Sequence, residues 1–376
     1  MTRIARIMIK NQTVIVKVVG SQCNLRCRYC YYNGLDQTSP SVMSLDVLES
    51  FIRQHMGMFN GKLYFIWHGG EPLLAGLSLF EAIITLQRRY SRAGHDVHNH
   101  IQTNGTLLTD DWVRFFNEHK FGVGLSIDGI SESHDLCRVD QDGDGTHACV
   151  MRGVGLLRKD AVKFGVIQVV TPVQLPFLEK SFHFFVEDLG IKQWSINVPG
   201  IGHCSNQDNS WSLSNGQYVA MMKTIMRLWI DRRDKDLVIR QVEDFICGVQ
   251  RKKSGHCNFC GTCDKYYCLD NKGYVFPCDD LTNGPDYCFG NIMEQGLEES
   301  LCCEKRIAYL AEIAVPRDEC AMCQWWSVCH GGCPAQRIGG LGGKYCFCGA
   351  RQKLFRHTEQ LVRNYAEIES DTGFLL

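Results

Sequence analysis

The sequence predicts an α/β protein built on a parallel sheet, followed by a cysteine-rich region. Three observations support this fold class. Strand-like and helix-like segments alternate six times between residues 14 and 231. Unusual glycine-containing or polar loops follow the first four predicted strands. Of the 21 cysteines, 15 lie between Cys247 and Cys348. Alternation of strands with helices implies parallel strands joined by right-handed crossovers.

The predicted elements follow from hydrophobic periodicity and from helix-capping residues. A β-branched run forms the first strand, and Ser44 and Thr109 are suitable N-caps for two of the helices. Strands are expected at residues 14–19, 63–67, 97–102, 121–126, 164–170 and 192–197. Helices are expected at residues 44–56, 79–90, 109–119, 149–159, 177–189, 214–231 and, near the end of the chain, 351–368. Periodicity weakens after residue 234, so we divide the chain into a barrel region, 1–234, and a cysteine-rich region, 235–376.

Composition restricts the classes of function. The formal net charge is −1, so the sequence shows no electrostatic footprint for nucleic acid or an anionic membrane. No apolar run has the length of a membrane span, and the first ten residues do not resemble a secretory signal. A cytoplasmic location is therefore expected. An odd number of cysteines in a reducing compartment favours metal binding or catalysis over disulfides. The cysteine-rich region has too few apolar residues for a core of its own, so metal clusters are expected to stabilise it.

The most informative motif is Cys23-x3-Cys27-x2-Cys30, which lies just after the first predicted strand. Three thiolates can bind three irons of a [4Fe–4S] cluster and leave the fourth iron open to an external ligand. Clusters that only carry electrons normally have four cysteine ligands. The alternative is structural zinc, which prefers C-x2-C pairs and needs a fourth ligand.

Three more loops are expected beside this cysteine loop. His-Gly-Gly-Glu-Pro, residues 68–72, follows the second strand, Thr-Asn-Gly, 103–105, follows the third, and Ser-Ile-Asp-Gly, 126–129, follows the fourth. The carboxyl ends of parallel barrel strands meet on one rim, where the chemistry of such folds collects. The sequence therefore predicts a single active site built from these loops.

With these motifs, the chain resembles the radical SAM superfamily from about Val14 to its C-terminus. The resemblance implies a partial (β/α)6 barrel, with S-adenosylmethionine binding the open iron through its amino and carboxylate groups. Its reductive cleavage would give a 5′-deoxyadenosyl radical that abstracts hydrogen from an unactivated carbon. The implied cosubstrate contacts are Tyr29, Gly69, Gly70, Glu71, Ser126 and Arg138. Glu71 and nearby carbonyls would bind the ammonium, Ser126 and Arg138 the ribose and carboxylate, and Tyr29 would lie against the adenine. Simple packing for Tyr29 and a loop salt bridge for Arg138 are the alternatives.

The later cysteines, with their C-x2-C-x5-C-x3-C run, resemble the SPASM extension, which carries two auxiliary [4Fe–4S] clusters. Three clusters are thus implied in all. Along the full length, the chain is similar to the anaerobic sulfatase-maturating enzymes. Alignment of Pro-Cys-Asp, residues 277–279, with that family implies a first auxiliary group of Cys257, Cys263, Cys278 and Cys333. The second auxiliary group is Cys320, Cys323, Cys329 and Cys348. Cys346 is the alternative to Cys348, Cys260 and Cys268 compete for the first group, and zinc is the alternative metal.

In the sulfatase-maturating family, the aspartate that matches Asp279 deprotonates the substrate radical. A carboxylate beside a cluster and a cavity is a suitable general base. The alternative is a structural aspartate that accepts hydrogen bonds from local amides.

The SPASM extension usually accompanies peptide or protein substrates. His68 replaces the glutamine that precedes Gly-Gly-Glu-Pro in the sulfatase-maturating family, and this local form looks more like the ribosomal-peptide maturases. We therefore predict oxidation of a ribosomally made peptide to a cross-link, ring or other modified residue. Sulfatase maturation, cysteine or serine to formylglycine, is the alternative, and a non-enzymatic electron carrier is a remote one. His68, Gln102 and Asn104 are candidates for contact with the peptide, and the alternative for His68 is that it only caps its strand. A reductant of flavodoxin or ferredoxin type is implied.

Overall fold

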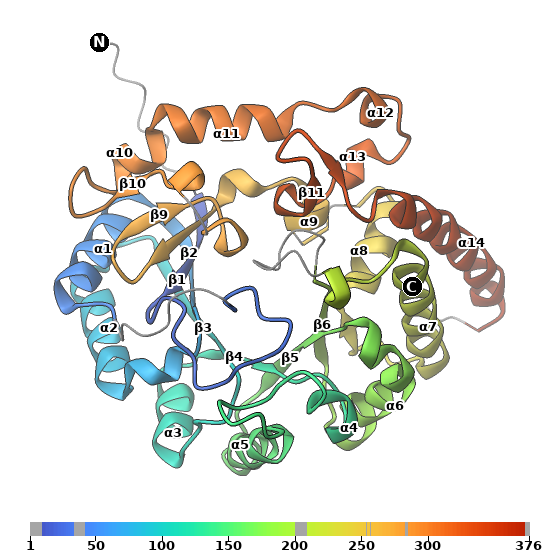
Figure 1. Ribbon diagram of the computed structural model, residues 1–376, viewed down its shortest axis with the longest axis horizontal. Helices are drawn as coiled ribbons and strands as arrows, with labels where there is room; N and C mark the ends of the chain where they lie inside the picture. Colours follow the sequence, from blue (N-terminus) through green and yellow to red (C-terminus); the bar gives the residue numbers. More distant parts are fainter. Residues whose placement is uncertain are drawn as a thin grey trace.

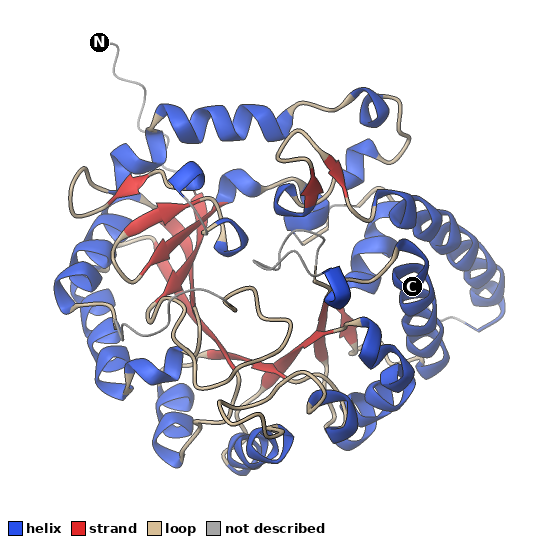
Figure 2. Ribbon diagram, in the orientation of Figure 1, coloured by secondary structure: helices blue, strands red, loops and turns tan. Residues whose placement is uncertain are grey.

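The computed structural model describes residues 10–33, 42–199, 209–252, 254–255, 257–282 and 285–372. Within these residues, ten strands form one sheet in the order β10-β9-β8-β1-β2-β3-β4-β5-β6-β7. The sheet curves into an open ring, and most of the helices lie outside it (Figures 1 and 2). Strands β1 to β7 are all parallel, which confirms the predicted α/β class.

The strands of this sheet and of a small second sheet have the following bounds: β1 Lys10–Lys17, β2 Asn60–His68, β3 His95–Thr103, β4 Gly122–Ser126, β5 Phe164–Val169, β6 Gln193–Asn197, β7 Val238–Ile239, β8 Tyr266–Asp270, β9 Tyr274–Phe276, β10 Gly290–Asn291, β11 Arg337–Ile338 and β12 Lys344–Tyr345. The α-helices are α1 Leu45–Met58, α2 Leu77–Tyr90, α3 Asp110–Glu118, α4 Ser131–His134, α5 His147–Lys159, α6 Leu178–His183, α7 Asn215–Arg232, α8 Arg240–Val249, α9 Cys257–Cys260, α10 Leu297–Cys302, α11 Glu304–Ala314, α12 Asp318–Ala321, α13 Trp326–Cys329 and α14 Cys348–Thr372. None of the helices in the described part of the chain is long and apolar enough to cross a membrane.

The helix starts show why these segments fold as predicted. The Ser44 side chain accepts a hydrogen bond from the Val47 amide at the start of α1. Thr109 does the same for the Trp112 amide at the start of α3. Each cap satisfies one of the unpaired amides in the first turn of its helix. The helix predicted over residues 177–189 differs, since α6 ends at His183 and continues as a π-helical turn.

The cysteine-rich region extends the barrel sheet, which the sequence analysis did not anticipate. Strand β8 pairs in parallel with β1, and β9 and β10 continue the sheet in antiparallel fashion. Apolar side chains of this region, among them Phe259, Tyr267 and Leu269, belong to the same hydrophobic core as the barrel. Shared packing with the barrel therefore supplies apolar burial that the region lacks alone. The division of the chain at residue 234 stays a prediction.

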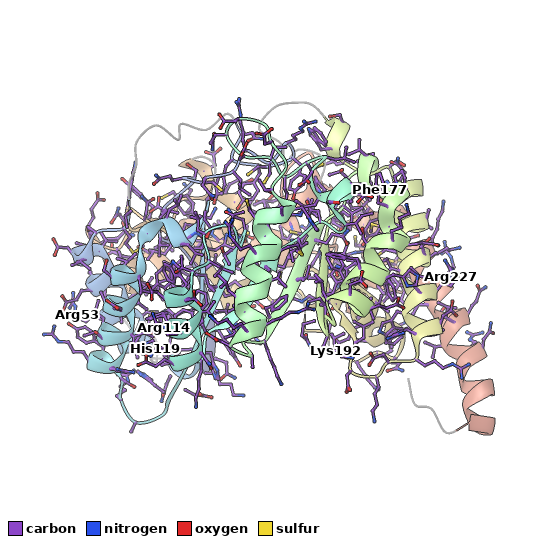
Figure 3. The ribbon with its side chains drawn as sticks, turned by 90° about the horizontal axis from the view of Figure 1, so that it is seen from below. Arg53, Arg114, His119, Phe177, Lys192 and Arg227 are labelled. Atoms are coloured by element: carbon purple, nitrogen blue, oxygen red, sulfur yellow. The ribbon has the colours of Figure 1, made fainter. Side chains whose placement is uncertain are left out.

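The carboxyl ends of the strands face one side of the ring, and their loops gather there. In Figure 3 the labelled Phe177, which follows β5, lies toward the upper side, whereas Lys192 and His119 lie lower, each just before a strand. Helix α14 packs against α7 and α8 (Figure 1).

Candidate active site

A cavity of about 480 Å³ lies among the loops at the carboxyl ends of the strands. Its wall brings together most of the predicted cosubstrate and substrate residues, and part of the first auxiliary group. The predicted residues on the wall are Cys23, Cys27, Tyr29, Cys30, His68, Gly69, Gly70, Gln102, Asn104, Ser126, Arg138, Cys257, Asp279 and Cys333. Loops that are far apart in the sequence therefore form one chemical site.

The loop that carries Cys23, Cys27 and Cys30 is held by backbone hydrogen bonds. The amides of Arg26 and Arg28 donate to the carbonyls of Val139 and Cys137, each over 2.8 Å. Within the loop, the Cys30 amide donates to the Cys27 carbonyl over 3.0 Å. Burial raises the pKa of the Cys27 thiol to about 12, and it raises the pKa of Cys23 to about 12 as well. Bound iron would favour the thiolates, because its positive charge offsets the cost of burying them.

The Gly-Gly-Glu-Pro loop packs directly on the cysteine loop. The Gly70 amide donates to the Gly20 carbonyl over 2.9 Å, and the Glu71 amide donates to the Gln22 carbonyl over 2.8 Å. A Cβ atom on Gly70 would lie 1.9 Å from the Gln22 carbonyl oxygen, so only glycine fits this approach. Gly69 has φ +119°, in the region that favours glycine.

The Glu71 side chain is held by hydrogen bonds within the protein, and its contact with the ammonium of the cosubstrate stays a prediction. It is fully buried and is not part of the cavity wall. Its carboxylate accepts hydrogen bonds from the Leu73 amide, the Thr103 hydroxyl and the Asn104 amide, over 3.0, 2.7 and 2.7 Å. Burial raises its pKa to about 7, against the opposing effect of these hydrogen bonds. The carboxylate therefore joins the loops after β2 and β3, and the backbone of Gly69 and Gly70 is what this loop offers to a ligand.

Asp128 is a site residue that the sequence analysis did not single out, although it lies in the Ser-Ile-Asp-Gly loop. Its carboxylate pairs with Arg138 Nε over 2.9 Å, and both side chains are buried. It also accepts hydrogen bonds from the Tyr29 hydroxyl over 2.6 Å and from the Val169 amide over 2.9 Å. Arg138 thus forms the loop salt bridge and also lies on the cavity wall, with Nη1 4.0 Å from Cys27 Sγ.

Two of the three predicted peptide contacts, Gln102 and Asn104, have side chains already engaged within the protein. Gln102 donates to the Ser126 hydroxyl over 2.9 Å. Asn104 Nδ2 donates to Asn24 Oδ1 over 2.9 Å, and its Oδ1 accepts from the Thr106 amide and hydroxyl. Asn104 therefore positions the cysteine loop, and the contact of either residue with a peptide stays a prediction.

Lys17 is a second site residue that the sequence analysis missed. It is 2% exposed and lies opposite His68 in the β1–β2 register. Its ammonium donates to the Asp279 carbonyl over 2.9 Å and to the Thr282 hydroxyl over 2.7 Å. Burial alone would lower its pKa, but electrostatic interactions with Tyr32, Cys268 and Asp279 outweigh this effect and raise it. A charged Lys17 therefore anchors the segment that follows Cys278.

His68 lies on the same side of the cavity. Its side chain is half-buried, and its Nδ1 has no hydrogen-bond partner among the described residues. Burial lowers its pKa, Lys17 lowers it further, and Asp279 opposes both. A neutral imidazole is thus available to a ligand in the cavity.

The first auxiliary group is assembled from four separate segments of the chain. Cys257 and Cys333 line the main cavity, Cys278 interacts electrostatically with both of them, and Cys263 interacts with Cys333. Cys268 is fully buried on β8, and the charged groups that influence its pKa are Lys17 and acidic side chains rather than the thiols of this group. The placement supports the four predicted ligands over Cys268. The side chain of Cys260 lies outside the described residues.

The second auxiliary group surrounds a cavity of about 40 Å³, with Cys320, Cys323, Cys329 and Cys348 on its wall. Cys346 is buried in the hydrophobic core and is not part of that wall. This arrangement favours Cys348 over Cys346 as the last member.

The donor sets suit clusters better than single ions. Among the described side chains, no three His, Cys, Asp or Glu residues converge on a point where one metal ion would bind. A zinc site needs four ligands about 2–2.3 Å from one point. A [4Fe–4S] cluster places its irons at separate corners and so spreads its thiolates around a larger volume. The fold thus places the three cysteines of the N-terminal motif on the wall of one cavity, as expected for an enzyme with a catalytic iron–sulfur cluster.

Comparison with known proteins supports this interpretation of the site. Residues 18–174 match the Radical SAM superfamily. The cysteine-type anaerobic sulfatase-maturating enzyme of Clostridium perfringens (strain 13 / Type A) is 32% identical over 328 residues, which cover 85% of this chain and 88% of that protein. The serine-type enzyme of Klebsiella pneumoniae is 31% identical over 346 residues, covering 91% and 86%. A solved structure of native anSMEcpe with bound AdoMet and Cp18Cys peptide superposes with a TM-score of 0.84 at 28% identity, covering 95% of this chain and 99% of that chain.

The chain belongs to the family of radical SAM enzymes that includes the anaerobic sulfatase-maturating enzymes. It is an enzyme that uses a [4Fe–4S] cluster and S-adenosylmethionine and acts on a peptide or protein. The many further cysteines are consistent with additional clusters. The relatives favour the sulfatase-maturating alternative over the predicted maturation of a ribosomally made peptide.

Proposed function

We propose that the protein oxidises a cysteine or serine of a sulfatase-type polypeptide to formylglycine. Similarity to cysteine-type and serine-type sulfatase-maturating enzymes over most of both chains carries this proposal. The shared cavity supports it, because the cysteine loop and Asp279 face the same space.

We assign the cluster ligands and the cosubstrate contacts to residues of the chain as follows. Cys23, Cys27 and Cys30 would hold the catalytic cluster, and the two auxiliary groups would hold the others. The cosubstrate would be held by the backbone of Gly69 and Gly70 and by the side chains of Tyr29, Ser126 and Arg138. When bound, the catalytic cluster and S-adenosylmethionine supply a carbon radical that removes a hydrogen atom from the substrate. The auxiliary clusters supply a nearby acceptor for one electron.

Asp279 is the proposed general base. Oxidation of the target residue removes one hydrogen atom from Cβ, then one proton from the thiol or hydroxyl and one electron. Asp279 would take that proton, and Lys17 would fix its position through the Asp279 carbonyl. A serine then gives the aldehyde directly, whereas a cysteine gives a thioaldehyde that exchanges its sulfur for the oxygen of water.

The test is an anaerobic incubation with S-adenosylmethionine, dithionite and sulfatase peptides that carry cysteine or serine at the target position. Mass spectrometry after hydrazide labelling should detect an aldehyde on at least one peptide. Asp279→Asn should retain release of 5′-deoxyadenosine but lower aldehyde formation about a hundredfold or more. If this variant formed aldehyde at the parent rate, Asp279 would not be the general base.

A second candidate is maturation of a ribosomally made peptide, and His68 favours it. This residue lines the cavity where the sequence departs from the sulfatase-maturating pattern. A peptide product that has lost two hydrogens and does not react with hydrazide would identify this activity. His68→Gln should then lower that product without raising aldehyde formation.

We also propose an external one-electron reductant of flavodoxin or ferredoxin type as a partner, because the reductive chemistry needs an electron source. Replacing dithionite with reduced flavodoxin or ferredoxin should sustain release of 5′-deoxyadenosine. No release with either protein would refute this partner class.

A further inference from the structure

Arg351 on α14 is a buried cation that the catalytic site does not use. Its side chain is 1% exposed, and its guanidinium lies 3.9 Å from the centre of the Phe259 ring and 4.3 Å from that of Tyr345. One of its amino groups donates to the Asn258 carbonyl over 3.0 Å and to Cys329 Sγ over 3.5 Å. The other donates to Asn258 Oδ1 over 2.6 Å. Arg351 therefore joins the chain just after Cys257 to a cysteine of the second auxiliary group.

This cation lacks an ordinary counter-charge. Within the described part of the chain, none of the polar contacts of Arg351 is with a carboxylate, and its Nε has no hydrogen-bond partner. A buried charge without a partner is strongly destabilising. A [4Fe–4S] cluster held by four thiolates carries net negative charge, so a cluster at the second auxiliary group would supply the missing partner.

The surroundings of the two auxiliary groups differ in charge. Arg351 lies on the wall of the second cavity beside Cys329, and the less buried Arg317 lies on the same wall and interacts with Cys320. The nearby ammonium of Lys344 is paired with Glu319 over 2.7 Å, so its charge is largely compensated. In the first auxiliary group, two acidic residues, 279 and 280, directly follow Cys278 in the chain and line the main cavity.

We propose that Arg351 raises the reduction potential of the cluster held by the second auxiliary group above that of the first. The inference rests on the ligand groups of the proposed function. Reduction adds one negative charge to a cluster, so a buried cation and an N–H···S hydrogen bond stabilise the reduced form. An electron on a cluster held by the first group would then be transferred to one held by the second. The first cluster would be oxidised and the second reduced, with no bond made or broken.

The test measures midpoint potentials in the full chain. Cys23, Cys27 and Cys30 are replaced with alanine so that only the auxiliary clusters contribute to the electron paramagnetic resonance signal. Arg351→Met should lower the midpoint potential of the second cluster enough to change the ratio of reduced to oxidised cluster at least tenfold, about 59 mV for one electron. Arg351→Lys keeps the charge and should shift it less. Arg356→Met, an exposed position on the same helix, should leave it unchanged.

A signal lost in Cys348→Ala identifies the second cluster, and iron content and circular dichroism report on its occupancy and on folding. An Arg351→Met protein with full iron and the parent potential would overturn the inference and leave the ligand groups standing. Loss of the second cluster in both Arg351→Met and Arg351→Lys would assign Arg351 a purely structural role and would also overturn it. If Cys348→Ala keeps the iron content and every signal of the parent, the proposed ligand group and the inference fail together. Formation of formylglycine is scored separately in single Arg351 and Cys348 variants that keep Cys23, Cys27 and Cys30.

Discussion

Replacing Asp128 with alanine removes the carboxylate that compensates the buried charge of Arg138. The two side chains are 0% and 8% exposed, and the Nε to Oδ2 distance is 2.9 Å. Removing one partner of a buried ion pair costs about 3–5 kcal/mol, because the other charge stays buried without compensation. The Tyr29 hydroxyl and the Val169 amide also lose their acceptor. We therefore expect the free energy of unfolding to fall by about 4 kcal/mol.

Urea unfolding of the anaerobically reconstituted protein, followed by circular dichroism, measures this loss. Asp110→Ala is the matched control, because Asp110 forms an ion pair with Lys159 in which both side chains are mostly exposed. Such exposed pairs contribute little to stability, so this variant should unfold like the parent. An Asp128→Ala protein within about 1 kcal/mol of the parent would refute the reasoning, since that is the range of an exposed pair. Cleavage of S-adenosylmethionine should fall as well, because Tyr29 and Arg138 form part of the cavity wall.

Three more predictions test separate parts of the structure. Gly70→Ala would place a Cβ 1.9 Å from the Gln22 carbonyl oxygen and displace the cysteine loop, so release of 5′-deoxyadenosine should be largely lost, and parent-level release would contradict the packing. His55 is buried, which lowers its pKa from 6.5 to about 3, so the unfolded chain binds more protons than the folded one below pH 6.5. Its contribution to stability should therefore fall by about 1.4 kcal/mol between about pH 7.5 and 5.5, and urea unfolding of His55→Gln should lack this part of the pH dependence. Cys348→Ser should lower the iron content per chain, whereas Cys346→Ser should not, and the reverse result would exchange their roles.

The order of strands and helices was predictable because it depends on local patterns. Ser44 and Thr109 cap helices through side chains that reach only three residues ahead, so their roles can be inferred from a short window. The rim loops were predictable for a related reason, since parallel strands bring their carboxyl ends together. The joining of β8 to β1 was not, because this pairing brings together residues about 250 positions apart.

The contacts that the sequence analysis missed depend on burial, which local patterns reveal only in part. The Glu71 carboxylate is occupied by Thr103 and Asn104, which lie at the end of a different strand. Lys17 interrupts an apolar, β-branched strand, and this interruption was the available signal for a buried functional cation. Arg351 carried no such signal, because it lies in a polar helix and only packing shows that it is buried.

The central claim is that Cys23, Cys27 and Cys30 hold a cluster with one iron open to S-adenosylmethionine. The most direct measurement is the release of 5′-deoxyadenosine by the anaerobically reconstituted protein with dithionite and S-adenosylmethionine. We expect steady release from the parent protein and none from Cys27→Ala, although that variant should keep the iron of its auxiliary groups. Equal release from Cys27→Ala, or no release from a fully iron-loaded parent protein, would contradict the account.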